Sequence, residues 1–408
     1  MSTAISSALR RALRPGRRCY HVASRQQRAN GGRQPSWAPL VRCQRPAAGS
    51  RRGLGAGVEV GSAGLDWARI GFDFQPTNGF VKFDWKDGRW DAGTFEPEPY
   101  LKMHVMSSAI HYGQGVYEGA KAHHCADGEV RLWNIDANAK RMTEGCARMM
   151  MPEVPEALFV KACEWAVAAN LAYVPPYGSG GAMYIRPYIF GHGPQLGLSP
   201  APTFSFCVLA IPVSSYYAGG LKPIDVLVAD GYDRAAPQGV GNVKASGNYG
   251  SDILVTLNAR AEGYPTVLYL DAKEKKYVEE FSVSNFVGLK AGAGGQLTYV
   301  TPDTDSVLRS TTNDLLMELA ASDDFGMAVE RRPVPVEELD DFDEVAGCGT
   351  AVVMMGVKSI TLKDKVYEYG SIDNVERLYD RYRAIQFGEA PDAFGWGSVV
   401  PPLPDAAA

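Results

Sequence analysis

The chain has 408 residues, of which 46% are hydrophobic and 21% are charged, and its net charge is −5. This length allows two domains with full cores, and this composition excludes a fibrous or disordered protein. No apolar run is long enough to span a bilayer, so we expect no membrane partner.

The first 58 residues carry twelve arginines and no acidic residue. Together with the serine-rich start and the amphipathic run over residues 5–14, this predicts a cleaved transit peptide over residues 1–58. We expect it to address the mitochondrial matrix, with a plastid as the alternative. Without these arginines, 29 basic side chains face 46 acidic ones. The excess of acidic residues in the rest of the chain argues against nucleic acid as a partner. It also argues against the alternative that residues 1–58 form a basic arm that binds nucleic acid.

The rest of the chain has scattered cysteines without a Cys-x-x-Cys pair, which indicates unlinked, mostly buried thiols in a reducing compartment. They are Cys125, Cys146, Cys163, Cys207 and Cys348. The run His123-His124-Cys125 has metal-binding side chains, but three consecutive residues cannot all face one ion. Because Asp127-Gly128 follows, the pattern favours a surface turn over a metal site.

In the first half, alternating residues around Asp87-Gly88 predict a β-hairpin over 80–91, and 129–133 predicts a strand. Asp136 is expected to cap a helix that runs to about residue 150. Pro155 is expected to open another helix, whose core stripe is Leu158, Ala162, Trp165, Ala166 and Ala169. Strands are expected at 183–190 and 203–211.

In the second half, strands are expected at 224–230, 266–271, 276–281, 285–289 and 342–348. Helices are expected from about Asn248 to a glycine cap at Gly263, over 313–321, and from a cap at Asp373. The glycine-rich stretch 291–295 could hold phosphate, but the strand pattern after it favours a hairpin turn. These elements predict an N-terminal domain over 65–213, a linker over 214–222, a C-terminal domain over 223–396 and a tail over 397–408.

Residues 239–249, Gly-Val-Gly-Asn-Val-Lys-Ala-Ser-Gly-Asn-Tyr, place Lys244 in a loop rich in glycine. Glycine lets the backbone approach a ligand closely, and a neutral lysine amine forms Schiff bases. Taken alone, the spacing favours a solvated lysine. Likewise, Ser310-Thr311-Thr312 before a helix suits plain N-capping or an anion site.

The chain from about residue 72 to 396 resembles the branched-chain amino-acid aminotransferases, because seven features occur in that family's order. They are 112–121, Arg141, Tyr184-Ile-Arg186-Pro, the Lys244 loop, Tyr277-Val-Glu-Glu280-Phe, 310–312 and Gly349-Thr-Ala351. The family belongs to the class IV aminotransferases, which depend on pyridoxal 5′-phosphate. The resemblance implies an α/β (α+β) fold of type IV, with two α/β domains and the cofactor in the cleft between them. It also implies a homodimer with partner residues near the pocket.

The resemblance implies that six residues bind the cofactor: Lys244, Arg141, Tyr249, Glu280, Thr311 and Thr312. Lys244 matches the Schiff-base lysine, which also moves the Cα proton of the substrate. Glu280 matches the carboxylate that keeps the pyridine nitrogen protonated, while Glu279 is expected to be a solvated carboxylate on the opposite face. Tyr249 matches the partner of the phenolic oxygen. Arg141 matches the phosphate arginine, although its position alone suits a helix-surface ion pair.

Six residues are implied in substrate binding: Tyr112, Tyr184, Arg186, Thr350, Ala351 and Phe72. The turn at Thr350 and Ala351 would hold the α-carboxylate, with Tyr112 as a hydroxyl donor. Arg186 and Tyr184 would receive the distal carboxylate of glutamate and leave an apolar pocket, lined by Phe72, for aliphatic side chains. Residues 191–197 resemble the loop that closes over the substrate.

The chain departs from the family pattern at the phosphate turn, which has Arg309-Ser310 and Asn313 in place of Pro-Gly and a following arginine. Ser246 stands where glycine is usual. Val352 and Met355 occupy the positions of a redox Cys-x-x-Cys present in some animal members, so we predict no thiol switch there.

The resulting prediction is a transaminase that reversibly exchanges amino groups between L-leucine, L-isoleucine or L-valine and 2-oxoglutarate, by a ping-pong mechanism. Its products would be branched 2-oxo acids and L-glutamate, and it would serve branched-chain amino acid biosynthesis or catabolism. D-amino-acid transaminases and a lyase share the fold, but the Tyr184–Arg186 pair and the lysine loop favour the branched-chain type. A cofactor-free binding protein would need to lack Lys244 or Glu280, and both are present.

Overall fold

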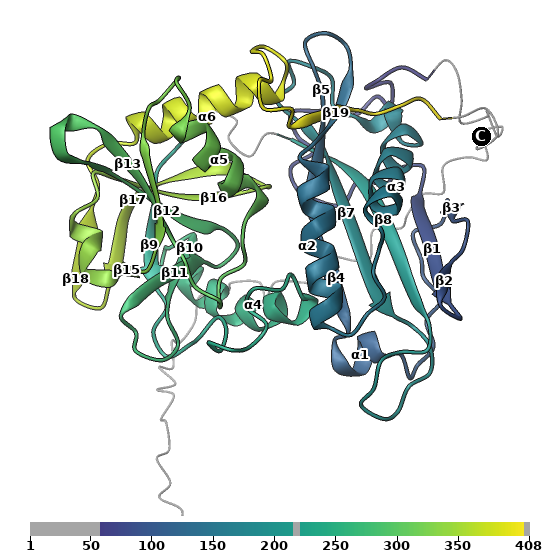
Figure 1. Ribbon diagram of the computed structural model, residues 1–408. Helices are drawn as coiled ribbons and strands as arrows, with labels where there is room; N and C mark the ends of the chain where they lie inside the picture. Colours follow the sequence, from purple (N-terminus) through teal and green to yellow (C-terminus); the bar gives the residue numbers. More distant parts are fainter. Residues whose placement is uncertain (1–57, 215–220, 404–408) are drawn as a thin grey trace, which may run out of the picture. The chain divides into compact units, whose positions relative to one another are not determined.

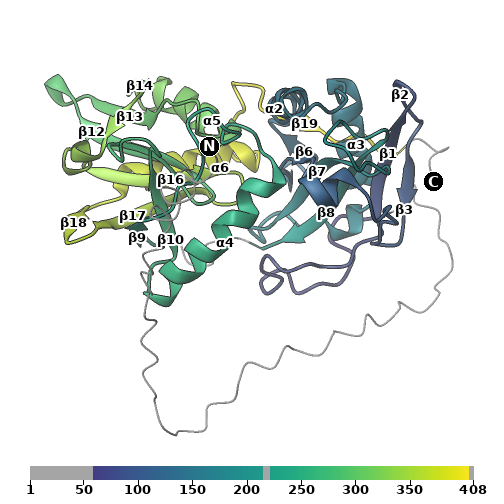
Figure 2. The same cartoon turned by 90° about the horizontal axis from the view of Figure 1, so that it is seen from below.

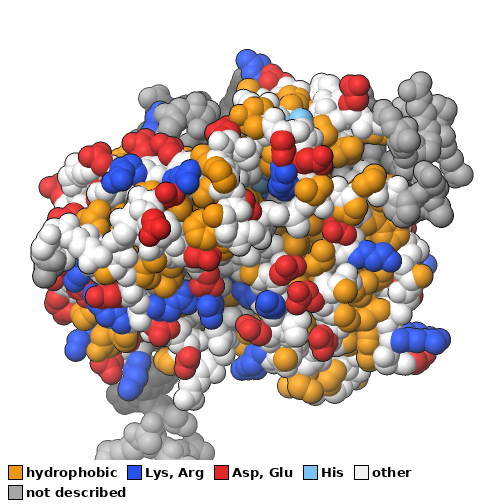
Figure 3. Space-filling model, turned by 45° about the horizontal axis from the view of Figure 1, so that its top comes forward, with side chains coloured by type: hydrophobic (Ala, Val, Ile, Leu, Met, Phe, Trp, Pro, Cys, Tyr) orange, Lys and Arg blue, Asp and Glu red, His pale blue; other side chains and the backbone are white. Residues whose placement is uncertain are grey.

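The computed structural model describes residues 58–214 and 221–403. The predicted transit peptide, apart from residue 58, lies outside these ranges, as do residues 215–220 of the predicted linker and 404–408 of the predicted tail. No described helix is both long and apolar enough to cross a membrane. On the face shown in Figure 3, acidic and basic side chains are interspersed.

Within the described residues, the first half of the chain forms a nine-stranded sheet with the path β19-β6-β5-β7-β8-β1-β2, and β3 and β4 pair with β1 and β7 (Figure 1). Its strands are β1 (Phe80–Lys86), β2 (Arg89–Trp90), β3 (Thr94–Glu96), β4 (Gly115–Tyr117), β5 (Ala120–His124), β6 (Val130–Trp133), β7 (Ala182–Gly191), β8 (Phe204–Val213) and β19 (Gly397–Val399). The β1–β2 hairpin confirms the turn signal, since Asp87 and Gly88 have φ of 53° and 82°, the positive values that a two-residue hairpin turn requires.

Three helices and a short 3₁₀ turn belong to this half: α1 (Ser108–Tyr112), α2 (Ile135–Arg148), α3 (Glu156–Ala168) and η1 (Leu171–Tyr173). In Figures 1 and 2, α2 and α3 lie along the same face of the sheet. Apolar side chains of both helices share one buried cluster with Val81, Phe83 and Phe206 of the strands. This cluster is the core that fixes β4, β5, β7 and α2, which all carry residues of the candidate site.

The second half forms a ten-stranded sheet with the path β14-β13-β12-β16-β17-β9-β10-β11-β15, within the described residues. Because β11 also pairs with β12, the six strands from β12 to β11 close into a barrel. The strands are β9 (Ile224–Val228), β10 (Thr266–Leu270), β11 (Tyr277–Phe281), β12 (Asn285–Ala291), β13 (Leu297–Pro302), β14 (Ala328–Arg332), β15 (Val334–Pro335), β16 (Glu344–Gly349), β17 (Val353–Leu362) and β18 (Lys365–Glu368). β12 and β13 pair antiparallel on either side of residues 292–296. This confirms that the glycine-rich stretch is a hairpin turn and not a phosphate loop.

The helical elements of the second half are α4 (Ser246–Ala261), α5 (Thr311–Ala321), α6 (Asp373–Gln386), η2 (Ala293–Gly295) and η3 (Val336–Asp340). α5 and α6 pack together against β16, and α4 packs on β10 (Figure 2). α6 buries Val375, Leu378, Tyr382 and Ile385, as predicted. Gly263 follows α4 with a φ of 96°, which confirms the glycine that ends this helix.

Two predicted helix caps are wrong. Asp373 is the first residue of α6, whose N-cap is Ile372. Asp136 does not cap α2: the N-cap is Asn134, with a φ of 50°, and Asp136 lies in the first turn, where its charge favours the helix dipole. α3 buries Phe159, Ala162, Cys163, Ala166 and Val167. The predicted stripe does face the core, since Ala162, Ala166 and Ala169 are buried and Leu158 and Trp165 pack against it partly buried. It is wider than predicted, because α3 is apolar on more than one face.

Two further expectations need correction. His123 is fully buried in β5, so it does not lie in a surface turn, although β5 and β6 do pair antiparallel on either side of Asp127-Gly128. Residues 397–399, predicted to begin the tail, form β19 and pair with β6. The five cysteines of the described chain are free and buried, as predicted.

Candidate active site

The lysine loop is joined to β4 of the first sheet through its backbone. Val116 and Ala245 form an isolated antiparallel bridge, and the N–H of Tyr117 donates to the carbonyl of Lys244 at 3.1 Å. Because α4 begins at Ser246, Tyr249 lies in its first turn and its hydroxyl accepts from Lys244 Nζ at 3.0 Å. Lys244 Nζ also lies 4.9 Å from the centre of the Tyr117 ring. Lys244 is therefore a half-buried amine between two tyrosines, as its predicted role requires.

Glu280 lies buried on β11, with 4% of its surface exposed. Its Oε1 accepts from the N–H of Leu308 at 3.0 Å and lies 2.6 Å from Nη2 of Arg234. Burial raises the pKa of Glu280 to about 7, although Arg234, the Leu308 N–H and Lys244 all favour its charged form.

The expectation that Glu279 is solvated is wrong. Glu279 is 3% exposed and accepts a hydrogen bond from Ser306, and burial raises its pKa. The physical reason is that the segment after β13 covers the side of β11 that Glu279 faces, where Ser306 donates to its carboxylate.

Sequence reasoning missed Arg234, the buried partner of Glu280. Its guanidinium also donates to the carbonyls of Gly241 and Ser306, so it links the lysine loop to the strand that carries Glu280. The available signal was an arginine in the loop after β9, directly before the lysine loop, but the sequence does not show its partner 46 positions later.

Arg141 is partly buried, with 12% of its side chain exposed, and its acidic partner Glu118 is fully buried, so the two do not form a solvated surface ion pair. Its Nε and Nη2 donate to the two oxygens of Glu118 at 2.7 and 2.6 Å, and its Nη1 donates to the carbonyl of Arg309 at 2.9 Å. A guanidinium has five N–H groups, so two of them remain for a ligand within the described part of the chain. Sequence reasoning missed Glu118, which is fully buried and also accepts from Asn138.

The predicted phosphate turn is the first turn of α5. Ser310 is its N-cap and accepts from the N–H of Asn313 at 3.1 Å, and Thr311 and Thr312 are the first two helical residues. The first N–H groups of a helix have no partner within it and carry a partial positive charge. Arg141 bonds to the carbonyl of Arg309 directly before this turn, so the predicted phosphate-binding groups lie together.

Arg186 and Tyr184 are neighbours on β7, as predicted from their spacing. Arg186 Nη2 donates to the Tyr184 hydroxyl at 3.1 Å, and its guanidinium lies 4.7 Å from the centre of the Tyr117 ring. Arg186 Nε is buried and has no hydrogen-bond partner among the described residues. A Cβ at Gly119 would collide with the Tyr184 hydroxyl, so the glycine permits this packing.

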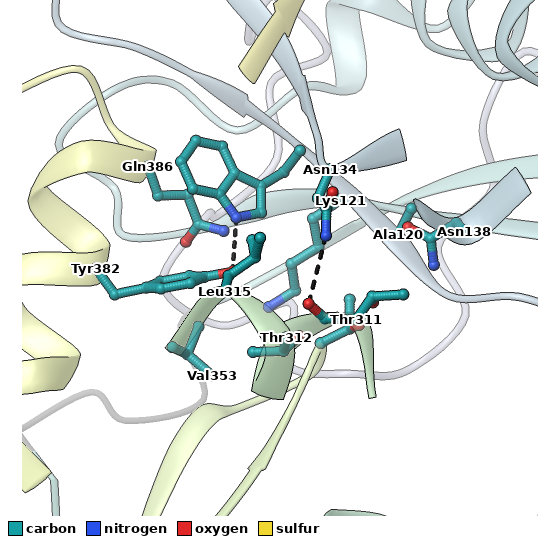
Figure 4. A pocket seen from close by; sticks show the side chains of 12 residues that line it. Ala120, Lys121, Asn134, Asn138, Thr311, Thr312, Leu315, Val353, Tyr382 and Gln386 are labelled. Carbon is teal, nitrogen blue, oxygen red and sulfur yellow. Dashed lines mark hydrogen bonds between the residues drawn. The ribbon is translucent and has the colours of Figure 1, made fainter. Parts of the chain in front are cut away.

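Thr350 and Ala351 lie in the turn between β16 and β17, where Gly349 pairs with Val353. Thr350 lines a small cavity together with Thr311, Thr312 and Lys121 (Figure 4). The substrate turn and the phosphate turn therefore share one cavity. The carbonyl of Ala351 accepts a hydrogen bond from Lys121 Nζ at 2.8 Å.

The structure does not bring Tyr112 to the Thr350–Ala351 turn of its own chain. Tyr112 ends α1, is 43% exposed and donates its hydroxyl to the carbonyl of Leu196, in the loop predicted to close over the substrate. Phe72 is 46% exposed, and its predicted place in the apolar pocket stays a prediction. Within the described ranges no group of three or more His, Cys, Asp or Glu residues could hold a metal ion.

These side chains fit pyridoxal phosphate. Lys244 is the amine for an aldehyde, Glu280 is a buried acid for a ring nitrogen, and Arg141 beside the start of α5 suits a phosphate. A family model for amino-transferase class IV matches residues 115–360. The chain belongs to the class IV aminotransferase family, which confirms the family and the type IV fold expected from the sequence.

Comparison with individual proteins shows which members of this family the chain is similar to. The branched-chain-amino-acid aminotransferase of Haemophilus influenzae is 39% identical over 341 residues, which cover 81% of this chain and 98% of the relative. Aminotransferase atnJ of Emericella nidulans is 39% identical over 330 residues, which cover 78% and 94%. The crystal structure of the branched-chain amino acid aminotransferase of Escherichia coli matches with a TM-score of 0.66 at 26% identity, over 80% of this chain and all of that one.

Proposed function

We propose that this enzyme is a pyridoxal-phosphate-dependent transaminase that exchanges amino groups between L-leucine, L-isoleucine or L-valine and 2-oxoglutarate. Support comes from relatives named branched-chain aminotransferases and from the match between the site and that reaction. Other relatives of similar identity have different names, so the substrate assignment depends on the side chains of this site.

The observation that carries the proposal is the pair of cations that lie against the ring of Tyr117. Arg186 lies 4.7 Å and Lys244 4.9 Å from the centre of that ring. An anion bonded to the guanidinium of Arg186 would thus lie within a side chain's length of the reactive amine. The aromatic rings of Tyr117 and Tyr184 around Arg186 also offer apolar surface. One site can then accept the distal carboxylate of glutamate or an aliphatic side chain.

When bound, the cofactor supplies an aldehyde and an electron-withdrawing ring. Lys244 Nζ, placed by the β4 bridge and Tyr249, is the base that moves the proton at the substrate Cα. Glu280 holds a proton at the ring nitrogen, and Arg141 with Thr311 and Thr312 binds the phosphate. The turn at Thr350 orients the α-carboxylate.

The test is steady-state kinetics of the Arg186→Met variant with L-leucine as amino donor and 2-oxoglutarate as acceptor. We expect the KM for the acceptor to rise by about 10- to 100-fold, the value of a lost hydrogen bond to a charged group, while the KM for L-leucine changes little. Arg89→Met, on an exposed arginine of β2, is the matched control. Turnover of D-alanine without turnover of L-leucine by the wild type would contradict the proposed function.

We also propose a homodimer. α4 exposes Ile253, Leu254 and Leu257 by 55–59%, and Ile253 and Leu257 line a cavity of about 330 Å³ that also includes Ala351. A second copy covering this apolar surface would complete the side of the substrate turn that Tyr112 of the same chain does not reach. Sedimentation of the wild type and of Leu257→Glu tests this; a fully active wild-type monomer at micromolar concentration would contradict it.

The N-terminal segment is proposed to direct import into the mitochondrial matrix, or alternatively into a plastid. The proposal follows from its arginine-rich, acid-free composition. Fractionation of cells that express the full chain, followed by N-terminal sequencing of the mature protein, tests it. An uncleaved cytosolic protein would contradict it.

A further inference from the structure

Lys121 is a buried lysine without an acidic partner. Only 7% of its surface is exposed, and among the described residues no carboxylate forms a salt bridge with it. Of the residues that line the two small cavities beside it, none is Asp or Glu. A buried ammonium is normally paired with an acid, so the positive charge of this one is not neutralised by any described residue.

The hydrogen bond of Lys121 crosses from the first sheet to the substrate turn. From β5, Nζ donates to the carbonyl of Ala351 at 2.8 Å, although the two residues are 230 positions apart. A peptide unit is planar and trans, so holding this carbonyl also sets the direction of the Val352 N–H. Lys121 thereby fixes the orientation of the turn whose N–H groups are proposed to hold the α-carboxylate.

The turn needs such a restraint because it ends in an unfavourable backbone conformation. Val353 has a φ of 65°, a value that β-branched residues rarely adopt, and such positions persist only when their surroundings enforce them. Val353 is buried and lines both cavities together with Lys121. In Figure 4 the Lys121 side chain extends from β5 toward the start of α5, beside Val353 and Thr312.

Resting on the proposed function, we propose that Lys121 is a positioning residue for the α-carboxylate: its positive charge and its bond to Ala351 hold the substrate turn in its binding conformation. Burial and the nearby charge of Arg383 lower the pKa of Lys121 to about 7. A bound carboxylate would therefore favour the charged form of this amine. All the substrates proposed above have an α-carboxylate, so Lys121 serves donor and acceptor equally, unlike Arg186, which serves the distal carboxylate.

The test compares Lys121→Met, Lys121→Gln and Lys121→Arg with the wild type, using L-leucine and 2-oxoglutarate. Met removes both bond and charge, Gln keeps a neutral donor, and Arg keeps the charge. We expect Met and Gln to raise the KM for both substrates by a similar factor of about ten or more, with a smaller change in kcat. Arg should restore both values to within a few-fold of the wild type. Lys140→Met, on the exposed face of α2, is the control.

Three results would overturn the proposal: unchanged KM values in Lys121→Met, a rise for one substrate only, or wild-type behaviour of Lys121→Gln. Circular dichroism establishes that each variant is folded. If Lys121→Met does not fold, the comparison relies on Lys121→Gln, which keeps a neutral hydrogen-bond donor. A wild type without L-leucine turnover would refute the proposed function, and the Lys121 comparison would be made on the substrate that it does turn over.

Discussion

Glu280 makes folding of the cofactor-free protein dependent on pH. Its pKa in the folded protein is about 7, against an ordinary value of 4.5. Between these values the folded state binds a proton that the unfolded state releases, so the free energy of unfolding falls as pH rises. One pKa unit corresponds to about 1.4 kcal/mol. Raising the pH from 5 to 8 should therefore lower the free energy of unfolding by about 2 to 3 kcal/mol through the ionisation of Glu280.

Glu280→Gln isolates this cost, because glutamine has the same shape and does not titrate. We expect urea unfolding of the cofactor-free proteins to show that the variant gains about 2 to 3 kcal/mol relative to the wild type between pH 5 and pH 8. All other titrating groups cancel in this difference. A difference that does not change with pH would show that Arg234 keeps Glu280 charged throughout, and it would refute the view that burial prevails over the ion pair.

Three further predictions concern the site and the cysteines. Lys244→Ala should abolish transamination, and borohydride treatment followed by mass spectrometry should find no cofactor attached to the variant; an adduct on another lysine would contradict the assignment. Arg141→Met leaves the buried carboxylate of Glu118 without its cationic partner, so it should lower the free energy of unfolding by about 3 to 5 kcal/mol. It should also weaken cofactor binding. Urea unfolding measures the first effect and absorbance titration the second. In the protein without residues 1–58, oxidants should not change activity reversibly, and a thiol reagent should react only after unfolding. The reason is that its five cysteines are buried: Cys125, Cys146, Cys163, Cys207 and Cys348.

The features predicted well are those that one stretch of chain determines. The Asp87–Gly88 hairpin follows from residues that accept positive φ, and the pairing of Tyr184 with Arg186 follows from the two-residue period of a strand. The amine of Lys244 and the hydroxyl of Tyr249 meet because a loop runs directly into a helix. In each case the geometry is set within a few residues, so the sequence is sufficient.

The features missed depend on partners far apart in the chain. The bonds of Arg234 to Glu280 and of Arg141 to Glu118 join different elements, and no local pattern indicates them. The buried position of Glu279 follows from the segment at Ser306 that covers it, which the alternation of one strand does not reveal. The displacement of Tyr112 from the substrate turn likewise depends on where α1 packs relative to the loop at Leu196.

The short segment from Val116 to Arg141 organises the whole site. Val116 bridges to the lysine loop, Arg141 bonds to the residue before the phosphate turn, and Lys121 bonds to the substrate turn. The three turns that are predicted to hold the amine, the phosphate and the α-carboxylate are thus each bonded to β4, β5 or α2. Because these elements share one buried core, a shift of the segment would displace the amine, the phosphate site and the carboxylate site together. This explains physically why residues that never touch the substrate, such as Glu118 and Gly119, lie at the centre of the site.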